Sequence, residues 1–214
     1  MKLYTYFRSS AAYRVRIALH LKNLDYESVP VHLLQDGGQQ HTATYAALNP
    51  NEAVPTLDDD GLILTQSLAI IEYLDEIHPN PPLLPGTAAD RARIRAIAQT
   101  IACDIHPINN LRVLQHLAHS FDLSQAQRTA WYCHWVERGL RTVEKMLAND
   151  PRTGRFCHGD SPTLADCCLV PQLFNARRYG CSLAGLETVL RICAECEGLE
   201  AFVRAAPEHQ PDAE

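Results

Sequence analysis

The first 80 residues alternate between short apolar runs typical of strands and stretches in which apolar residues recur at helical spacing. Residues 2–6 have strand character, and residues 27–33 are again rich in residue types that favour strands. Between them, after the turn at Ser9 and Ser10, apolar side chains recur three or four residues apart. The chain therefore begins with a predicted strand, helix and strand.

A hairpin and a further helix complete this part of the chain. Residues 49–52, Asn-Pro-Asn-Glu, interrupt regular structure, and the apolar runs 54–57 and 62–64 then flank a turn of three aspartates and a glycine. Ser67 is suited to cap a helix that runs to about Ile77. The predicted order is β-α-β-α-β-β-α, which indicates an α/β layer with a mixed four-stranded sheet.

A proline-rich segment separates this layer from the rest of the chain. Residues 79–86 hold four prolines, which neither a helix nor a central strand accepts. Long stretches with helical spacing follow at residues 88–118, 124–148, 163–179 and 188–205. Thr163 and Asp166 have the spacing of a capping box before the apolar run 167–173. We predict a domain over residues 1–80, a linker over residues 81–87 and an all-helical bundle over residues 88–214.

Composition and charge narrow the classes of function. The 214-residue chain carries 19 Lys and Arg against 25 Asp and Glu, a formal charge of −6, which provides no broad attraction for nucleic acid or an anionic membrane. Its first residues lack the apolar core of a signal peptide, and no apolar run approaches the ~18 residues of a membrane-spanning helix. We therefore expect a cytoplasmic protein that binds neither nucleic acid nor membrane.

The eight cysteines do not form the pattern of a disulfide framework, because all of them lie between Cys103 and Cys196. The Cys-x-x-Cys that starts at Cys193 lies in a helix-like segment and has no second pair at zinc-ribbon spacing. We expect these residues to be small buried hydrophobes, and we predict no metal site.

Several motifs resemble those of one known family. The segment SSAAYRVRIAL at residues 9–19 is similar to the signature Ser-Ser-Cys-x-x-Arg-Val-Arg-Ile-Ala-Leu of the zeta-class glutathione transferases. Further matches are ALNP at 47–50, VPTL at 54–57, QSLAIIEYL at 66–74, and shorter motifs at 110–114, 159–160 and 169–172. The chain thus resembles the group of zeta-class glutathione transferases and maleylacetoacetate isomerases, which includes bacterial maleylpyruvate isomerases. This resemblance implies a thioredoxin-like first domain followed by a helical bundle, the glutathione transferase fold, with glutathione as the cofactor.

The resemblance also implies a glutathione site that begins at the first helix. Hydroxyl groups and free backbone N–H groups at a helix start favour an anion such as a thiolate. Ser10 is the first choice for the thiolate partner by similarity to the class, Ser9 is close behind, and a plain N-cap serine is the alternative interpretation. The other residues implied to contact glutathione are Ala11, Gln40, Val54, Pro55, Gln66, Ser67, His106, Asn110, Leu111 and Arg112.

Two of these positions differ from a usual pattern, one in the expected geometry of its peptide bond and the other in its residue type. Only about one X-Pro bond in twenty is cis, so Val54-Pro55 alone favours trans, whereas the resemblance implies cis. Ala11 stands where the family signature usually has cysteine, so we expect no chemistry from an enzyme thiol there.

The substrates of the family are dicarboxylates, so we expect cations on the substrate side. Arg8 directly precedes the serine pair, and Arg178 stands where the family motif Asn-Ala-x-Arg has its basic residue, with Arg177 as the adjacent alternative. The expected substrate-binding residues are Arg8, Arg112 and Arg178, and solvated surface arginines are the other interpretation. The resemblance implies a homodimer that converts a maleyl keto acid to its fumaryl isomer. Its expected catalytic residues are Ser9, Ser10, Arg8 and Arg178.

Two other functions stay open at this point. A glutathione-conjugating or dehalogenating transferase would use the same thiolate without expelling it from the product. A non-catalytic binding module could share the fold, but Arg8 beside the serine pair argues against it. The sequence does not choose between maleylpyruvate and maleylacetoacetate, although Arg112 and Ala11 favour the shorter maleylpyruvate slightly.

Overall fold

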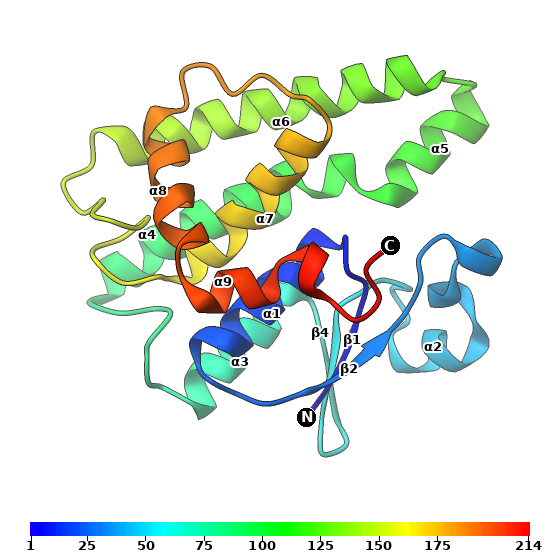
Figure 1. Cartoon of the computed structure of the whole chain (residues 1–214), viewed down its shortest axis with the longest axis horizontal. Coiled ribbons are helices and arrows are strands. Elements are labelled where there is room, and N and C mark those ends of the chain that lie inside the picture. Colours follow the sequence, from blue (N-terminus) through cyan, green and yellow to red (C-terminus); the bar gives the residue numbers. More distant parts are fainter. The chain divides into compact units, whose positions relative to one another are not determined.

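The computed structural model describes all 214 residues, and contacts within the chain divide it into two units. Unit 1 comprises Met1–Leu84 and Glu197–Glu214, and unit 2 comprises Pro85–Cys196. Figure 1 shows the course of the chain through its elements. This grouping differs from the predicted division, in which residues 88–214 form one domain.

Unit 1 contains a mixed four-stranded sheet. Its strands, in the spatial order β2-β1-β3-β4, are β1 (Lys2–Thr5), β2 (Glu27–Pro30), β3 (Thr56–Asp59) and β4 (Leu62–Thr65). β1 is parallel to β2, with Leu3 opposite Ser28, and antiparallel to β3, with Leu3 opposite Leu57. β3 and β4 form the predicted hairpin. The mixed four-stranded sheet predicted from the sequence is thereby confirmed.

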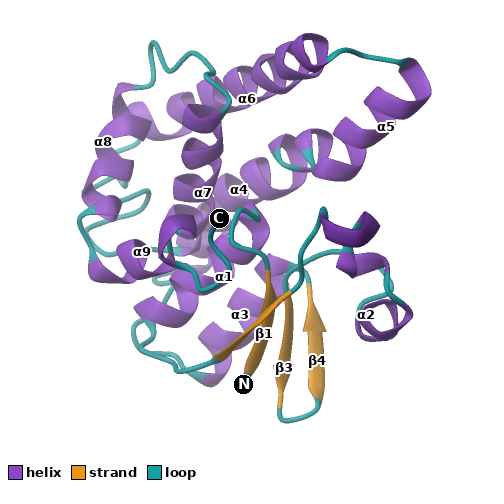
Figure 2. Cartoon of the chain, turned by 45° about the vertical axis from the view of Figure 1, so that its right-hand side comes forward, coloured by secondary structure: helices purple, strands orange, loops and turns teal.

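Helices cover both faces of this sheet. Figure 2 shows α1 (Ser10–Leu21) and α3 (Ser67–Ile77) together on one side, and α2 (Ala43–Leu48) on the other. Two 3₁₀ turns, Gln35–Gly37 and Gln39–His41, precede α2. The α1 and α3 side holds a fully buried core of sheet and helix residues, namely Leu3, Leu57, Val15, Ile17, Leu19, Ile70, Ile71 and Leu74.

The last part of the chain packs on α1 through α9 (Glu200–Ala205). Arg16 of α1 is fully buried, and its Nε donates to the Ala205 carbonyl at 2.9 Å while its Nη2 donates to the Phe7 carbonyl at 3.0 Å. A buried guanidinium needs such acceptors, because an unpaired buried charge is strongly destabilising. The α9 carbonyl therefore completes the surroundings of Arg16 and connects the last part of the chain to α1 within unit 1. The 3₁₀ turn Pro207–His209 follows α9.

Unit 2 is helical. Its helices are α4 (Ala88–Gln99), α5 (Leu111–Phe121), α6 (Gln125–Ala148), α7 (Leu164–Arg178) and α8 (Glu187–Glu197), of which only the last residue falls in unit 1. The predicted stretch 88–118 is interrupted by a π-helical turn, Thr100–Ile105, and a 3₁₀ turn, Pro107–Asn109, because proline has no N–H for the helical ladder. The predicted stretch 188–205 is two helices, which separate after Glu197 at a glycine.

The predicted capping box at the start of α7 is present. The Asp166 carboxylate accepts hydrogen bonds from the N–H and the hydroxyl of Thr163, each at 2.8 Å. Of the cysteines, Cys103 is exposed, Cys133 is half-buried and the others are buried, and all eight are free thiols. None of the helices combines the length and the apolar character that crossing a membrane requires.

Candidate active site

The start of α1 carries the residues predicted to hold a thiolate. Ser9 is the N-cap, and its Oγ accepts a hydrogen bond from the Ala12 N–H at 3.2 Å. A hydroxyl that accepts one hydrogen bond can still donate its own hydrogen, so capping and anion binding are compatible. Ser9 and Ala11 are half-buried, whereas Ser10 is only 5% exposed. Ser9 is therefore the more exposed of the two serines.

The loop that ends in Val54-Pro55 is held by side-chain hydrogen bonds, and this peptide bond is cis, as the resemblance implies. Tyr45 Oη and Asn49 Nδ2 both donate to the Ala53 carbonyl, each at 2.7 Å. Both side chains are buried, at 5% and 3% exposed. The backbone of Val54 is therefore presented by a loop that has little freedom to move.

One buried apolar cluster joins three of the predicted contact segments. Its members are Tyr6, Phe7, Val31, Tyr45 and Val54, with Tyr4 and Leu33 packed against it. Tyr6 and Phe7 directly precede Arg8 and the serine pair, and the Leu33 carbonyl accepts a hydrogen bond from Gln40 Nε2 at 3.4 Å. The serine pair, Gln40 and Val54 are thus positioned by the same core.

Gln40 has an unsatisfied buried polar atom. The side chain is 5% exposed, and its Oε1 has no hydrogen-bond partner. A buried carbonyl oxygen without a donor is costly, so this position suits a ligand that offers an N–H group. The residues present therefore fit an amide-containing ligand such as a peptide.

The start of α3 differs from the prediction, because Gln66 and not Ser67 is the N-cap. Gln66 has φ +70°, in the left-handed region, and Ser67 is the first helical residue. The Ser67 Oγ accepts a hydrogen bond from Arg14 Nη1 of α1 at 3.2 Å, and both side chains are buried. A guanidinium beside a helix start strengthens the attraction of that end for a carboxylate.

Sequence reasoning missed the role of Arg14. The available signal is its spacing: Arg14 lies four residues before Ala18 and seven before Leu21, so it shares the apolar face of α1. A charged residue at such a position is buried and needs a partner.

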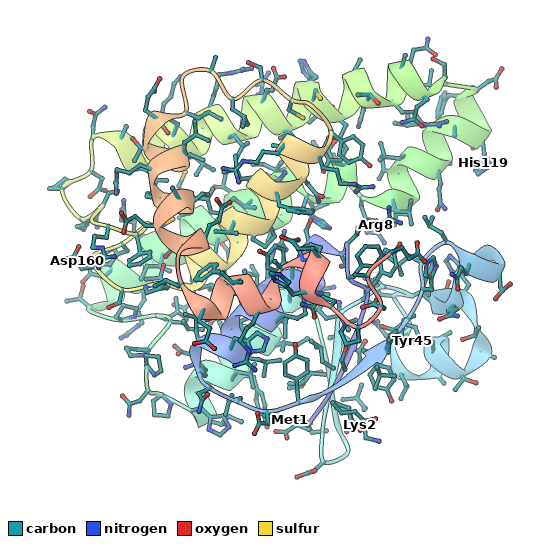
Figure 3. All side chains as sticks on the ribbon, in the orientation of Figure 1. Met1, Lys2, Arg8, Tyr45, His119 and Asp160 are labelled. Atoms are coloured by element: carbon teal, nitrogen blue, oxygen red, sulfur yellow. The ribbon has the colours of Figure 1, made fainter.

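Arg8 lies at the end of the loop after β1, and Figure 3 shows it beside the C-terminal coil. Its Nη2 donates to Tyr6 Oη at 2.7 Å, and its guanidinium carbon lies 4.8 Å from the centre of the Phe7 ring. The side chain is 30% exposed, and Nη2 lies 4.0 Å from Glu214 Oε2. A carboxylate ligand would meet a guanidinium that is already oriented, in competition with Glu214.

The C-terminal carboxylates beside Arg8 were not predicted as part of the site. Asp212 Oδ2 accepts a hydrogen bond from the Phe7 N–H at 3.0 Å, and Glu214 Oε1 lies 3.0 Å from His32 Nε2. No local sequence pattern could have identified these contacts, because they join residues about two hundred positions apart.

Unit 2 brings four of the predicted residues together at the start of α5. His106 follows the π-helical turn, and its Nε2 lies 3.3 Å from Asn110 Nδ2. Asn110 is the N-cap of α5, and its Oδ1 accepts a hydrogen bond from the Arg112 N–H at 3.2 Å. Leu111 is the first residue of the helix, and the Arg112 side chain is exposed.

Arg178 is the last residue of α7, and both it and Arg177 are exposed. The guanidinium carbon of Arg178 lies 5.2 Å from the centre of the Tyr179 ring, which in turn stacks on Tyr132. The aromatic pair gives Arg178 a defined neighbour. Since Arg8 belongs to unit 1 and Arg178 to unit 2, their joint action on one substrate stays a prediction.

Comparison with known proteins identifies the family to which this chain belongs. The model of the glutathione S-transferase N-terminal domain matches residues 3–82, and that of the C-terminal domain matches residues 124–205. The chain belongs to the glutathione S-transferase family. A probable maleylacetoacetate isomerase of Vibrio cholerae is 49% identical to this glutathione S-transferase over 211 residues, which cover 99% of this chain and 97% of the relative.

Two solved structures extend the similarity to the zeta class of the glutathione S-transferases. One is a holo structure of maleylpyruvate isomerase, described as a bacterial zeta-class glutathione S-transferase, with a TM-score of 0.97, 46% identity and complete coverage of both chains. Another, a maleylacetoacetate isomerase of Methylobacterium extorquens AM1 with bound malonate and glutathione, has a TM-score of 0.96, 43% identity and complete coverage of both chains. The resemblance seen in the sequence is thereby confirmed.

Unit 1 of this glutathione S-transferase also has a surface cleft. Its volume is about 490 Å³, and its lining includes His20, Tyr26 and Arg204. Burial, with the charges of Arg204 and Arg16, lowers the pKa of His20 to about 4. None of the predicted contact residues lines this cleft, so we do not assign the proposed chemistry to it.

Proposed function

We propose that this zeta-class glutathione S-transferase is a glutathione-dependent cis-trans isomerase that converts maleylpyruvate or maleylacetoacetate to its fumaryl isomer. The observation that supports this most is the end-to-end similarity to isomerases of these substrates, at 49% identity to one relative and 46% to a solved structure. The buried, oriented residues of unit 1 are consistent with it.

Glutathione fits the residues of unit 1. We infer that Ser67, Gln66 and the first N–H groups of α3 bind its γ-glutamyl carboxylate, with Arg14 behind Ser67. The backbone of Val54 faces the middle of the tripeptide, and Gln40 receives an N–H from the other end at its unsatisfied Oε1. From unit 2 we assign His106, Asn110, Leu111 and Arg112 as further contacts.

Bound glutathione would supply a sulfur nucleophile whose reversible addition to the cis double bond permits rotation. Ser9, Ser10 and the first N–H groups of α1, including that of Ala11, hold the negative charge on that sulfur. Lowering a thiol pKa by about two requires about 2.7 kcal/mol, within reach of one or two charge-assisted hydrogen bonds and a helix end. Arg8, Arg112 and Arg178 bind the substrate carboxylates and stabilise negative charge that develops on the substrate.

The test is a spectrophotometric assay of both keto acids with and without glutathione, in which glutathione is also quantified. We expect the trans product to form with no net consumption of glutathione, and turnover to stop when glutathione is removed. Stoichiometric consumption of glutathione would favour the alternative, a conjugating or dehalogenating transferase. Equal turnover without glutathione would refute the proposal, and the faster substrate decides between the two keto acids.

We further propose that the protein is a homodimer of the cytoplasm, in line with the family resemblance. Sedimentation at micromolar concentration should give about twice the 23.9 kDa mass of the chain. A stable and fully active monomer would contradict this assembly.

A further inference from the structure

The thiols of Cys133 and Cys181, which we call the thiol pair, meet in unit 2. Cys133 lies on α6 and Cys181 follows the end of α7, 48 positions later in the chain. Their Sγ atoms are 2.8 Å apart, with Cys181 donating towards Cys133. The S–S bond of a disulfide is ~2.05 Å long, so a shift of less than about 1 Å would join the two sulfurs.

Contacts on both sides hold the thiol pair in place. The rings of Tyr132 and Tyr179 stack with centres 3.7 Å apart and planes at 12°. On the other side, the Ser182 N–H donates to Glu137 Oε1 at 2.8 Å. These contacts are made by residues close to Cys133 and Cys181 in the chain. They therefore keep the two sulfurs close to each other although no bond joins them.

The two members of the thiol pair differ in access, and the surroundings of Cys181 disfavour its thiolate. Cys133 is half-buried and Cys181 is buried. Burial, the hydrogen bond with Cys133 and the negative charge of Glu137 raise the pKa of the Cys181 thiol. Cys133 is therefore the thiol that a small disulfide reaches first, and Cys181 is suited to complete the exchange.

We propose that Cys133 and Cys181 form a reversible disulfide by exchange with a low-molecular-weight disulfide such as glutathione disulfide. The Cys133 thiolate attacks one sulfur of glutathione disulfide, which breaks its S–S bond, releases one glutathione thiolate and leaves a mixed disulfide on Cys133. Cys181 then loses its proton to solvent and attacks the Cys133 sulfur, and the second glutathione leaves. Two protein thiols are oxidised and one glutathione disulfide is reduced to two glutathione molecules. This exchange goes beyond the proposed isomerase activity and does not rest on it.

The test equilibrates the full chain with glutathione and glutathione disulfide at a series of ratios, alkylates the remaining thiols, and determines the intact mass and the cross-linked peptides. We expect the loss of two hydrogens and a peptide pair that joins Cys133 to Cys181, both reversed by excess reduced glutathione. The same treatment should raise the Tm by about 5–15 °C, because the bond closes a long loop. No such peptide at any ratio, or a cross-link between other cysteines, would overturn the proposal.

Single substitutions assign the two roles. Cys181→Ser should stop the exchange at the glutathione mixed disulfide on Cys133, whereas Cys133→Ser should abolish both products. Cys103→Ser is the matched control, because it removes an exposed cysteine and should leave the cross-link unchanged. Formation of the cross-linked mass in either thiol-pair variant would contradict the assignment.

Glu137→Gln tests the chemistry without removing a thiol. Glutamine keeps an acceptor for the Ser182 N–H but removes the charge that disfavours the Cys181 thiolate. Resolution of the mixed disulfide should become about 2- to 5-fold faster. An unchanged or slower rate would overturn the role of Cys181 as the buried resolving thiol.

Discussion

At the residue scale, the neighbouring residues Ser9 and Ser10 have the same side chain but differ in their exposure. Ser9 is half-buried and its oxygen is oriented by the Ala12 N–H, whereas Ser10 is almost fully buried. The family similarity favours Ser10 as the thiolate partner, but this geometry favours Ser9. Substitution can separate the two.

Ser9→Ala should therefore have the larger effect on bound glutathione. Loss of one charge-assisted hydrogen bond of about 1.5–3 kcal/mol should raise the pKa of the bound thiol by about 1–2. Turnover near neutral pH should fall and should partly recover in alkali. The thiolate absorbance, titrated for Ser9→Ala, Ser10→Ala and the double variant, provides the measurement. Parental pH profiles in all three would show that neither hydroxyl activates the thiol.

Arg8 and Arg178, two of the three arginines predicted to bind the substrate carboxylates, should act on the substrate and not on glutathione. Arg8→Met or Arg178→Met should each lower kcat/KM for the dicarboxylate by roughly 10- to 150-fold, the value of one charged hydrogen bond. Glutathione affinity should be nearly unchanged, and lysine should rescue only partly because it lacks the planar fork. Arg177→Met, one residue away and also exposed, is the comparison variant, and it should lower kcat/KM less than Arg178→Met does. Unchanged kinetics at both sites would transfer the role to Arg112 or Arg177.

At the element scale, the π-helical turn of unit 2 depends on a glycine of α6. A Cβ at Gly139 would overlap the side chain of Ile105, the buried last residue of that turn. Gly139→Ala should therefore destabilise the protein by about 1–3 kcal/mol, and it should also disturb His106, the next residue. Urea unfolding measures the loss.

The control for this prediction changes the other partner. In an Ile105→Ala background the obstructing atoms are gone, so the same glycine substitution should stabilise α6 by up to about 1 kcal/mol through helix propensity. Equal destabilisation in both backgrounds would mean that the close approach is not the cause.

The junction of α1 and α9 carries a pH-dependent contribution to stability. Burial and the neighbouring arginines hold the pKa of His20 at about 4, against ~6.5 for an ordinary histidine. The unfolded chain therefore binds a proton at higher pH than the folded chain, so this contribution is complete above about pH 6.5 and is lost as the pH falls towards 4. Because the side chain is only half-buried, the loss after solvent screening is about 1–2 kcal/mol.

Urea unfolding between about pH 7 and 4.5 tests this contribution. His20→Gln cannot titrate and should lose less stability over that interval than the parent protein. The same slope of stability against pH in both proteins would assign the dependence to other groups.

At the scale of the whole molecule, local sequence patterns predicted helices, strands and turns better than they predicted which distant residues come into contact. The hairpin and the capping box at Thr163 were correct, because their signals lie within a few residues. The break around Pro107 was missed, since the apolar spacing continues through a turn whose shape depends on packing against Gly139.

The residues of the candidate site show the same difference between local and long-range signals. Motifs brought the serine pair and Val54-Pro55 to attention, and the cis bond followed from resemblance and not from local preference. Arg14 and Glu214 were missed because their contacts are set by distant parts of the chain. The helical spacing of Arg14 signals that its side chain is buried, but it does not identify Ser67, 53 positions away, as its partner.

The closure of unit 1 by α9 has a consequence for the order of biosynthesis. The ribosome completes residues 1–84 first, but Arg16 meets the Ala205 carbonyl only after all of unit 2 has been translated. At about 5–20 residues per second this delay is on the order of 10 s, during which α1 lacks its cover. Unit 2 is continuous in the chain and can finish first. A nascent chain that stalls before residue 197 therefore presents a complete helical unit attached to an unfinished α/β unit, and such a chain is a substrate for chaperones or proteases.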